Sequence, residues 1–301
     1  MSTVLRPPAA RQGPGPIPQS VVDRLEPRLT ARVARTLPGD RRAAGVGPGT
    51  ELAQIRPYQV GDDVRHIDAA ATARTGEPHV RLHVPERTLT TWIAIDVSPS
   101  MAFGSAQRLK ADVAEGAAIV LGRLAVRRAG AVGAVLFGAG DVHVTAPRGS
   151  RPGLVALRRT LALGAAEDGT RDPGALADAL ARLERLARLP GLVAVISDFR
   201  DQGGWAGPLG ALRARHSVLA IEVADPREDE IPDVGRLAVV DPETGQLLEV
   251  DTSHAGLRER FAAIETQRRE RLAGELRRLR VDHVRVRTDQ DWLAQLGRVL
   301  R

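Results

Sequence analysis

The sequence predicts an α/β protein with a doubly wound, mostly parallel sheet that is covered by helices on both faces and preceded by an N-terminal extension. Short apolar runs rich in β-branched residues, such as 90–95 and 192–197, have the composition of strands buried on both faces. Segments with helical spacing of roughly 10 to 20 residues separate these runs, and this alternation is typical of a parallel sheet. Because crossovers between parallel strands are right-handed, the helices cover both faces of the sheet.

Each element of this fold follows from a local pattern. Period-two alternation predicts a strand over 79–84, and apolar runs predict strands over 90–95, 131–137, 192–197, 218–223 and 284–287, with a hairpin partner over 141–146. Helical spacing predicts helices over 106–128, 151–163, 175–189, 208–215, 256–279 and 292–300, and a short one over 21–37. Two short apolar strands, 237–240 and 247–250, flank Glu243-Thr244-Gly245, which is a hairpin signature.

Composition divides the chain into three parts. Residues 1–44 begin with a Pro-, Gly- and Ala-rich stretch, and we expect them to be disordered or to form a short helix. Residues 45–88 open with a glycine-rich loop and continue without a regular pattern, so we expect an extension to the main domain. The alternation of strands and helices starts near residue 89, which makes residues 89–301 the expected main domain.

The bulk composition narrows the classes of function. The chain has 301 residues, 43% of them hydrophobic and 27% charged, which is ordinary for a globular protein. It has no cysteine, which excludes disulfides, thiolate metal sites and cysteine nucleophiles and fits a reducing compartment. The net charge of +6 comes almost entirely from arginine, since Lys110 is the single lysine. Without aromatic residues interleaved for base stacking, this charge does not indicate a nucleic-acid binder.

We also expect no membrane span. No segment reaches the roughly 18 to 20 apolar residues that a bilayer-spanning helix needs. The longest candidate, 117–126, is interrupted by Arg123, and residues 1–20 lack the apolar core of a signal peptide. A cytoplasmic location is therefore the expectation.

Oxygen-bearing side chains follow two of the predicted buried strands. Asp96 directly follows the apolar run 90–95 and ends this strand, and Ser98 and Ser100 lie in the short loop after it. Asp198 directly follows the strand 192–197, and Thr170 lies in a loop before the helix predicted over 175–189. In an open α/β sheet, ligands bind beyond the carboxyl ends of the strands, so these three loops are expected to meet at one rim.

Carboxylate and hydroxyl oxygens are hard ligands, which indicates a divalent cation. Mg²⁺ takes six oxygens in near-octahedral geometry and keeps several waters, so this donor set would leave an exchangeable position. Ligand type alone leaves Mn²⁺ and Ca²⁺ as alternatives. The sequence therefore predicts a Mg²⁺ site, with these two ions as possible substitutes.

The pattern Asp-x-Ser-x-Ser after a buried strand, with a later Gly-Thr loop and a Ser-Asp pair, resembles the metal-ion-dependent adhesion site of von Willebrand factor A-type (vWA) domains, which have a Rossmann-like fold. The resemblance implies that Ser98, Ser100 and Thr170 contact the metal. It implies that Asp96 and Asp198 act directly or through water. It also implies that a carboxylate from a protein partner completes the coordination.

A second resemblance covers roughly residues 45 to 300. The segments 52–68, 71–76, 241–245 and 288–289 are similar to the bacterial family called domain of unknown function 58, with one departure at Ala69, where the family usually has Trp. The resemblance implies that the extension 45–88 packs on the vWA core. It further implies an accessory or adaptor protein, not an enzyme, that works with a MoxR-type AAA+ ATPase.

Other interpretations of these residues stay open. The motif at 96–100, Asp198 and Thr170 could each cap a helix or shape a turn, and Asp168 or Asp172 could replace Thr170 as a ligand. The alternative function is a Mg²⁺-dependent phosphatase-like hydrolase with Asp96 as the nucleophile. Enzymes of the haloacid-dehalogenase type have a second aspartate two residues later, where this chain has Ser98.

Overall fold

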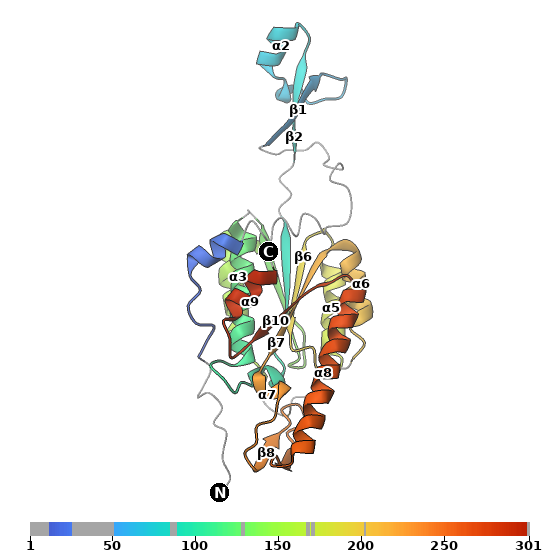
Figure 1. Ribbon diagram of the computed structural model, residues 1–301. Coiled ribbons are helices and arrows are strands. Elements are labelled where there is room, and N and C mark those ends of the chain that lie inside the picture. The colour runs from blue at the N-terminus through green and yellow to red at the C-terminus, as the bar shows by residue number, and fades with distance from the viewer. Residues whose placement is uncertain are drawn as a thin grey trace. The chain divides into compact units, whose positions relative to one another are not determined.

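The computed structural model describes residues 12–25, 51–84, 89–127, 130–166, 169, 172–201 and 203–299 (Figure 1). Contacts divide the chain into two units. Residues 39–88 form the smaller one, and residues 1–38 together with 89–301 form the larger one.

In the smaller unit, a two-stranded antiparallel sheet joins β1 (Glu51–Pro57) to β2 (His79–Val84), with η1 (Val64–His66) and α2 (Ala69–Thr75) between them. The Asp68 carboxylate starts α2 by accepting from the backbone N–H of Ala71 at 2.8 Å, and it also binds Arg81. Ala69 is exposed at the first position of α2. The predicted packing of the extension 45–88 on the core stays a prediction.

The larger unit is built on a six-stranded sheet with the order β10-β7-β6-β3-β4-β5. All neighbouring strands are parallel except β5, which runs antiparallel to β4. The strands are β3 (Thr90–Asp96), β4 (Ala131–Phe137), β5 (His143–Gly149), β6 (Leu192–Ser197), β7 (Ser217–Ala224) and β10 (Asp282–Arg287). The predicted class, a mostly parallel α/β sheet, is confirmed.

Helices cover both faces of this sheet (Figure 1). They are η2 (Pro99–Ala102), α3 (Lys110–Arg127), α4 (Ser150–Leu161), α5 (Ala175–Leu186), α6 (Ala206–Arg215), α7 (Pro226–Asp229), α8 (Ala255–Arg278) and α9 (Trp292–Val299). Alternate side chains of β3 belong to two hydrophobic cores, one on each face of the sheet. Ile93 and Ile95 pack with α3, α4 and α9, and Trp92 and Ala94 pack with α5, α6 and α8. None of the described helices is long and apolar enough to cross a bilayer.

Residues 12–25 belong to the larger unit. Residues 19–25 are helical, and Val22 and Leu25 are buried in the core beside α3 and α9. The backbone N–H of Gly13 donates to the Asp112 carboxylate at 3.0 Å. Within the predicted N-terminal segment 1–44, these residues therefore have defined contacts, and the other residues of that segment lie outside the described part of the chain.

The helix α3 begins at Lys110, four residues later than the pattern predicts. Residues 103–109 instead form a loop that is tied to the end of β7, because Ser105 donates its backbone N–H to the buried Asp225 carboxylate at 2.8 Å. The loop closes where the N–H of Lys110 donates to the carbonyl of Phe103 at 2.9 Å. The tertiary contact with Asp225 overrides the helical propensity of these residues.

The predicted hairpin is confirmed as β8 (Arg236–Val240) paired antiparallel with β9 (Leu247–Asp251). Its two strands pair with each other, and most of their side chains are exposed. Figure 1 shows β8 at the end of the larger unit where α7 and the start of α8 lie. The hairpin therefore belongs to the edge of the sheet at which the parallel strands end.

Candidate metal centre

The two strands that carry the predicted aspartates are neighbours in the sheet. From β3 the chain passes to β4 on one side, and it later returns to β6 on the other side of β3. This is the topological switch point, where the loops after adjacent strands diverge and leave a crevice. Asp96 is the last residue of β3 and Asp198 directly follows β6, so both carboxylates lie at this crevice.

Two serine hydroxyls lie between the two carboxylates. The Ser98 hydroxyl donates to Asp96 Oδ1 at 2.6 Å, and the Ser100 hydroxyl donates to Asp198 Oδ2 at 2.8 Å. The two serine Oγ atoms are 3.1 Å apart. The structure thus brings four of the five predicted ligands, Asp96, Ser98, Ser100 and Asp198, into one small volume.

The helix-capping interpretation does not account for these side chains. Ser98 is the residue before η2, but its hydroxyl makes no capping hydrogen bond, because it donates to Asp96 instead. The next helix after Asp198 is α6, whose N-cap residue is Trp205. Both serine hydroxyls therefore point to the carboxylates and not to a helix end.

The loop that holds the serines is fixed from within the protein. Pro99 starts η2, and Met101, which is fully buried in the core, anchors its far end. The backbone N–H of Ser98 donates to Asp96 Oδ1 at 2.9 Å, which closes the turn. Gly138, at the end of β4, packs against this turn so closely that a Cβ atom there would lie 2.8 Å from the Cβ of Ser98.

Three further residues of the site were not predicted from the sequence. Ser197 donates its hydroxyl to Asp96 Oδ2 at 2.6 Å. Lys110, which has no solvent exposure, places its ammonium 2.8 Å from Asp198 Oδ2 and 2.5 Å from Glu228 Oε1. Lys110 could have been noticed in the sequence because it is the single lysine. No local sequence pattern indicates Glu228, because α7 is brought to the site by the tertiary fold.

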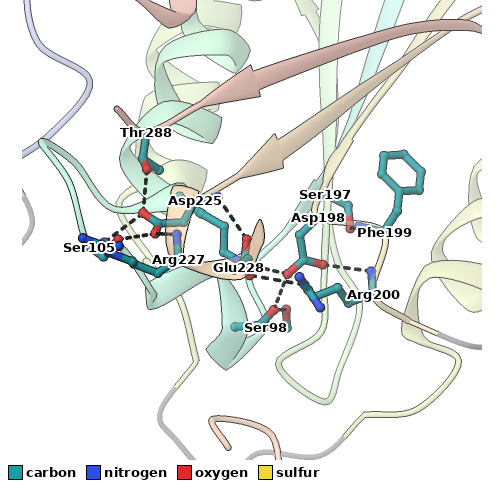
Figure 2. Close-up of polar contacts among 12 residues, drawn as sticks. Ser98, Ser105, Ser197, Asp198, Phe199, Arg200, Asp225, Arg227, Glu228 and Thr288 are labelled. Atoms are coloured by element: carbon teal, nitrogen blue, oxygen red, sulfur yellow. Dashed lines mark hydrogen bonds and ion pairs between the residues drawn. The ribbon is translucent and has the colours of Figure 1, made fainter. Parts of the chain in front are cut away.

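The same cluster extends to Arg200 (Figure 2). Its backbone N–H donates to Asp198 Oδ1 at 3.0 Å, and its guanidinium lies 3.2 Å from Glu228. The guanidinium also binds Glu265 on α8 through two hydrogen bonds. Asp198 therefore has an N–H partner at Oδ1, and its Oδ2 accepts from both the Lys110 ammonium and the Ser100 hydroxyl.

The pKa values of the two aspartates are shifted in opposite directions. Burial raises the pKa of Asp96 to about 7, and the neighbouring Asp198 carboxylate adds to the rise. Burial alone would also raise the pKa of Asp198, but the charge and hydrogen bond of Lys110, with the N–H of Arg200 and the hydroxyl of Ser100, lower it to about 2. Asp198 has its counter-charge within the protein, whereas Asp96 is surrounded by neutral hydroxyls.

Thr170 and Asp168 lie outside the described residues, so the structure does not place them. Asp172, the other alternative ligand, accepts from the backbone N–H of Gly140 at 3.2 Å and lines the same cavity as Asp96 and Asp198. Burial raises its pKa, although the N–H of Gly140 opposes the rise.

A cavity of about 760 Å³ opens over the four converging residues. Phe103 and Phe137 contribute apolar wall, and Arg227, Glu228 and the tip of the β8–β9 hairpin (residues 240–244) also line the cavity. The cavity is large enough for an ion with its waters and for a side chain brought by another molecule.

The donor set fits a hard cation only if the hydroxyls take part. In the part of the chain that the structure describes, no group of three or more His, Asp or Glu side chains could hold a metal ion by itself. Adjacent corners of a Mg²⁺ octahedron are roughly 3 Å apart when each metal–oxygen distance is about 2.1 Å. The 3.1 Å between the Oγ atoms of Ser98 and Ser100 matches that separation.

A phosphatase of the haloacid-dehalogenase type needs an acid two residues after its nucleophile, and this chain has none there. The position two residues after Asp96 is occupied by Ser98, whose hydroxyl donates to Asp96 itself. Both oxygens of Asp96 accept a serine hydroxyl, Oδ1 from Ser98 and Oδ2 from Ser197. This arrangement holds the carboxylate in place, and the position two residues later offers a hydroxyl instead of the second carboxyl group of the haloacid-dehalogenase type.

Comparison with known proteins fits the similarities seen in the sequence. A family model described as "Protein of unknown function DUF58" matches residues 54–271. The chain belongs to the DUF58 family. Uncharacterized proteins of Mycobacterium bovis and Mycobacterium tuberculosis are 38% identical to this DUF58 member over 298 residues, which cover 98% of this chain and 93% of theirs. An uncharacterized protein of Mycobacterium avium is 42% identical over 128 residues, 42% of this chain and 75% of its own.

Several solved structures are similar at low identity. The conserved hypothetical protein BatB of Bacteroides thetaiotaomicron is 20% identical, with a TM-score of 0.41, and the match covers 70% of this chain and 97% of that one. An aerotolerance-related membrane protein of Bacteroides fragilis is 16% identical, with a TM-score of 0.44 and coverage of 70% and 98%. The VWA domain of SpRpn10 is 15% identical, with a TM-score of 0.32 and coverage of 46% and 76%.

Proposed function

We propose that this DUF58 protein is a divalent-cation-dependent protein-binding module. Asp96, Ser98, Ser100 and Asp198 would hold Mg²⁺, for which Mn²⁺ or Ca²⁺ could substitute, and Thr170 is the expected fifth residue of the site. The observation that carries the proposal is the convergence of two carboxylates and two hydroxyls from two loops of the switch point, with each hydroxyl bonded to one carboxylate and the two Oγ atoms 3.1 Å apart.

The charge distribution supports a cation at this place. Asp96 is 5% exposed and has no cationic partner among its described contacts, so its negative charge is costly without an added ion. Each serine that could contact the ion gives its proton to one of the carboxylates, which leaves its lone pairs free for a metal. The ion would supply a positive centre to which a carboxylate from another molecule can bind.

The surroundings of the cavity support a protein as the partner. The hairpin strands next to it expose four large apolar side chains: Val239, Val240, Leu247 and Leu248. Exposed apolar groups beside a polar centre are the usual composition of a protein interface. We propose that the partner offers a carboxylate to the ion and covers these side chains, and that it is a MoxR-type AAA+ ATPase, for which this cytoplasmic protein would be an adaptor.

The first experiment measures metal binding. Thermal unfolding of the full chain is followed with Mg²⁺ or Mn²⁺ and with a chelator, for the wild type and for Asp96→Ala. Because a ligand that binds only the folded state stabilises it, the metal is expected to raise Tm in the wild type and to leave Asp96→Ala unchanged. Glu249→Ala, which removes an exposed carboxylate from β9, should respond like the wild type. Equal responses of wild type and Asp96→Ala would refute the metal site.

The second experiment tests the partner. The full chain is immobilised and exposed to a purified MoxR-type ATPase in Mg²⁺ and then in excess chelator. Retention in Mg²⁺ that is lost on chelation, and lost in Asp96→Ala, is the expected result. Retention that ignores both the chelator and the substitution would show that binding does not use this site.

A further inference from the structure

The tip of the β8–β9 hairpin is a preformed turn. The Asp241 carboxylate accepts from the backbone N–H of Glu243 at 3.0 Å and from the hydroxyl of Thr244 at 2.7 Å. The turn closes where the N–H of Gly245 donates to the carbonyl of Asp241 at 2.8 Å, with Gly245 in the left-handed region at φ 69°. Pro242 fixes φ near the start of the turn. The backbone position of Glu243 is therefore set by the hairpin's own bonds.

This turn lies against the loops of the candidate site. The carbonyl of Pro242 accepts from the backbone N–H of Gly169, the residue directly before the predicted ligand Thr170, at 2.8 Å. The backbone N–H of Ser100 lies close enough to the Glu243 carboxylate to stabilise its negative charge. Residues 240–244 line the same cavity as Asp96 and Asp198. The hairpin tip thus contacts two of the three loops from which the metal ligands were predicted.

The Glu243 carboxylate has an unfavourable neighbourhood unless a cation is present. The carboxylates of Asp198, Asp201 and Asp241 line the same cavity as Glu243. Like charges gathered in a partly buried site repel one another, and a bound cation reverses the sign of that interaction. At the apex of the turn Glu243 is half-buried against the cavity, whereas Thr244 and Gly245 are exposed.

We propose that Glu243 is an internal ligand of this site, a carboxylate that would complete the coordination of the cation held by Asp96, Ser98, Ser100 and Asp198. It would occupy the position that the partner's carboxylate takes in the bound state, so the hairpin and the partner would compete for the ion. This inference rests on the proposed function, since it requires a cation at these residues.

The hairpin is suited to give up its place at the ion to a partner's carboxylate. Its strands pair only with each other within the described chain, and an isolated two-stranded hairpin is marginally stable. Val239, Val240, Leu247 and Leu248 are exposed, so little apolar surface holds it in place. Opening it breaks the two contacts of the tip with Gly169 and Ser100, which is a small cost compared with unfolding the domain.

The test uses Mn²⁺ as the probe on the full chain. Calorimetric titration gives the Mn²⁺ affinity, and water-proton relaxation gives the number of waters on the bound ion. Because affinity for a hard cation depends on the number of charged ligands, Glu243→Gln is expected to weaken Mn²⁺ binding by about ten-fold or more and to add a water to the bound ion. Glu249→Gln, which makes the same change on exposed β9, is expected to alter neither quantity.

Acetate tests the competition directly. If Glu243 fills the position meant for a partner's carboxylate, acetate has little access to Mn²⁺ in the wild type. In Glu243→Gln it should displace water from the ion and lower the relaxation signal. An acetate response of the same size in both proteins would overturn the internal-ligand assignment.

The remaining outcomes separate this inference from the function on which it rests. Asp96→Asn is expected to lose Mn²⁺ binding altogether. If wild type and Glu243→Gln bind Mn²⁺ with equal affinity and equal hydration while Asp96→Asn does not bind, Glu243 is not a ligand and the metal site stands. If the wild type binds no Mn²⁺, both are wrong. Unfolding curves of all variants exclude loss of binding through loss of fold.

Discussion

The Lys110 ammonium donates to Asp198 Oδ2 at 2.8 Å from a position with no solvent exposure. It is enclosed together with Glu228, whose carboxylate is 2.5 Å away, so one cation serves two carboxylates. Burial opposes the charge on the ammonium, but the two carboxylates outweigh it, and the pKa of Lys110 is raised above its usual value. The site therefore contains a buried positive charge that Asp198 and Glu228 share.

Removal of this ammonium is expected to be strongly destabilising. Lys110→Met keeps most of the side-chain volume but leaves Asp198 and Glu228 without their shared partner. Breaking a buried pair in this way costs about 3 to 5 kcal/mol, which denaturant unfolding at neutral pH would show. The loss should shrink below about pH 4, because Asp198 becomes protonated in the variant and no longer needs a counter-charge.

The control for this variant is Arg278→Met, which removes an exposed ion pair with Glu275 on α8. Exposed pairs of this kind contribute about 0 to 1 kcal/mol. If Lys110→Met unfolds as easily as Arg278→Met, the buried ammonium is not what stabilises this cluster.

The metal-free protein is expected to lose stability as the pH rises. An acid whose folded-state pKa of about 7 lies above its ordinary value of 3.8 keeps a proton that the unfolded chain has released. The free energy of unfolding therefore falls between about pH 4 and pH 7 and stays low above pH 7. Asp96→Asn, which cannot ionise, should show less of this fall, so in chelator at about pH 8 its Tm should exceed that of the wild type.

The same pair of proteins gives the opposite order when metal is added. Mg²⁺ would stabilise the ionised form of the wild type and would not help Asp96→Asn. A wild type that is more stable than Asp96→Asn in chelator across the whole pH range would contradict the raised pKa of Asp96.

Alanine substitutions at two neighbouring glycines distinguish the effect of backbone strain from the effect of crowding the loop that holds Ser98 and Ser100. Gly138 and Gly140 both have positive φ, at 89° and 85°. Alanine at either position costs about 1 to 2 kcal/mol for the left-handed backbone. At Gly138 the new Cβ would also meet Ser98 at 2.8 Å and Asp96 Oδ1 at 3.1 Å, whereas at Gly140 it meets nothing within 4 Å.

We therefore expect both alanine variants to be less stable than the wild type, with Gly138→Ala lower by about a further 1 to 3 kcal/mol. Only Gly138→Ala should lose its thermal response to Mg²⁺, because it displaces the serine loop. The measurement is Tm with and without the ion, and a full response in Gly138→Ala would show that this loop tolerates the displacement.

A second buried carboxylate ties together three segments near the site. Asp225 accepts from the hydroxyl of Thr288 at 2.6 Å and from the backbone N–H groups of Ser105 and Arg227 at 2.8 Å and 3.0 Å (Figure 2). Hydrogen bonds to a charged group contribute about 1.5 to 3 kcal/mol each, although they do not add fully. Asp225→Ala is thus expected to cost more than about 3 kcal/mol, against about 1.5 to 3 kcal/mol for Thr288→Val, which removes one of these bonds.

Amide hydrogen exchange localises this effect. The N–H of Ser105 should lose protection in Asp225→Ala and keep it in Thr288→Val, since only the first substitution removes its acceptor. Comparable loss in both variants would mean that the 103–109 loop is held by other contacts.

Most of the sheet could be predicted because its strands are buried on both faces and their apolar runs are continuous. The strands at 131–137 and 192–197 have the predicted bounds. The convergence of Asp96 and Asp198 also followed from the sequence, because the carboxyl ends of adjacent parallel strands meet at one edge. In the smaller unit, β1 and α2 were not predicted, since their few apolar residues follow neither a two-residue nor a helical period.

The parts of the site that the sequence did not reveal come from tertiary contacts. Glu228 reaches Lys110 only because α7 follows β7 at the same sheet edge, and no local pattern marks that approach. Glu243 was visible as part of a hairpin turn, but the direction in which that turn points depends on the whole fold. Sequence spacing predicts which residues lie at the carboxyl ends of the strands. It says little about which side chains from later elements contact that edge of the sheet.

The enclosure of Lys110 has a practical consequence for probing the protein. These 301 residues contain a single ε-amine, and in the folded chain it lies between two carboxylates with no solvent exposure. An amine acylating reagent can modify Lys110 only when the cluster around Asp198 opens, so the extent of labelling at that one position, read by mass spectrometry, becomes a reporter of how often the crevice comes apart.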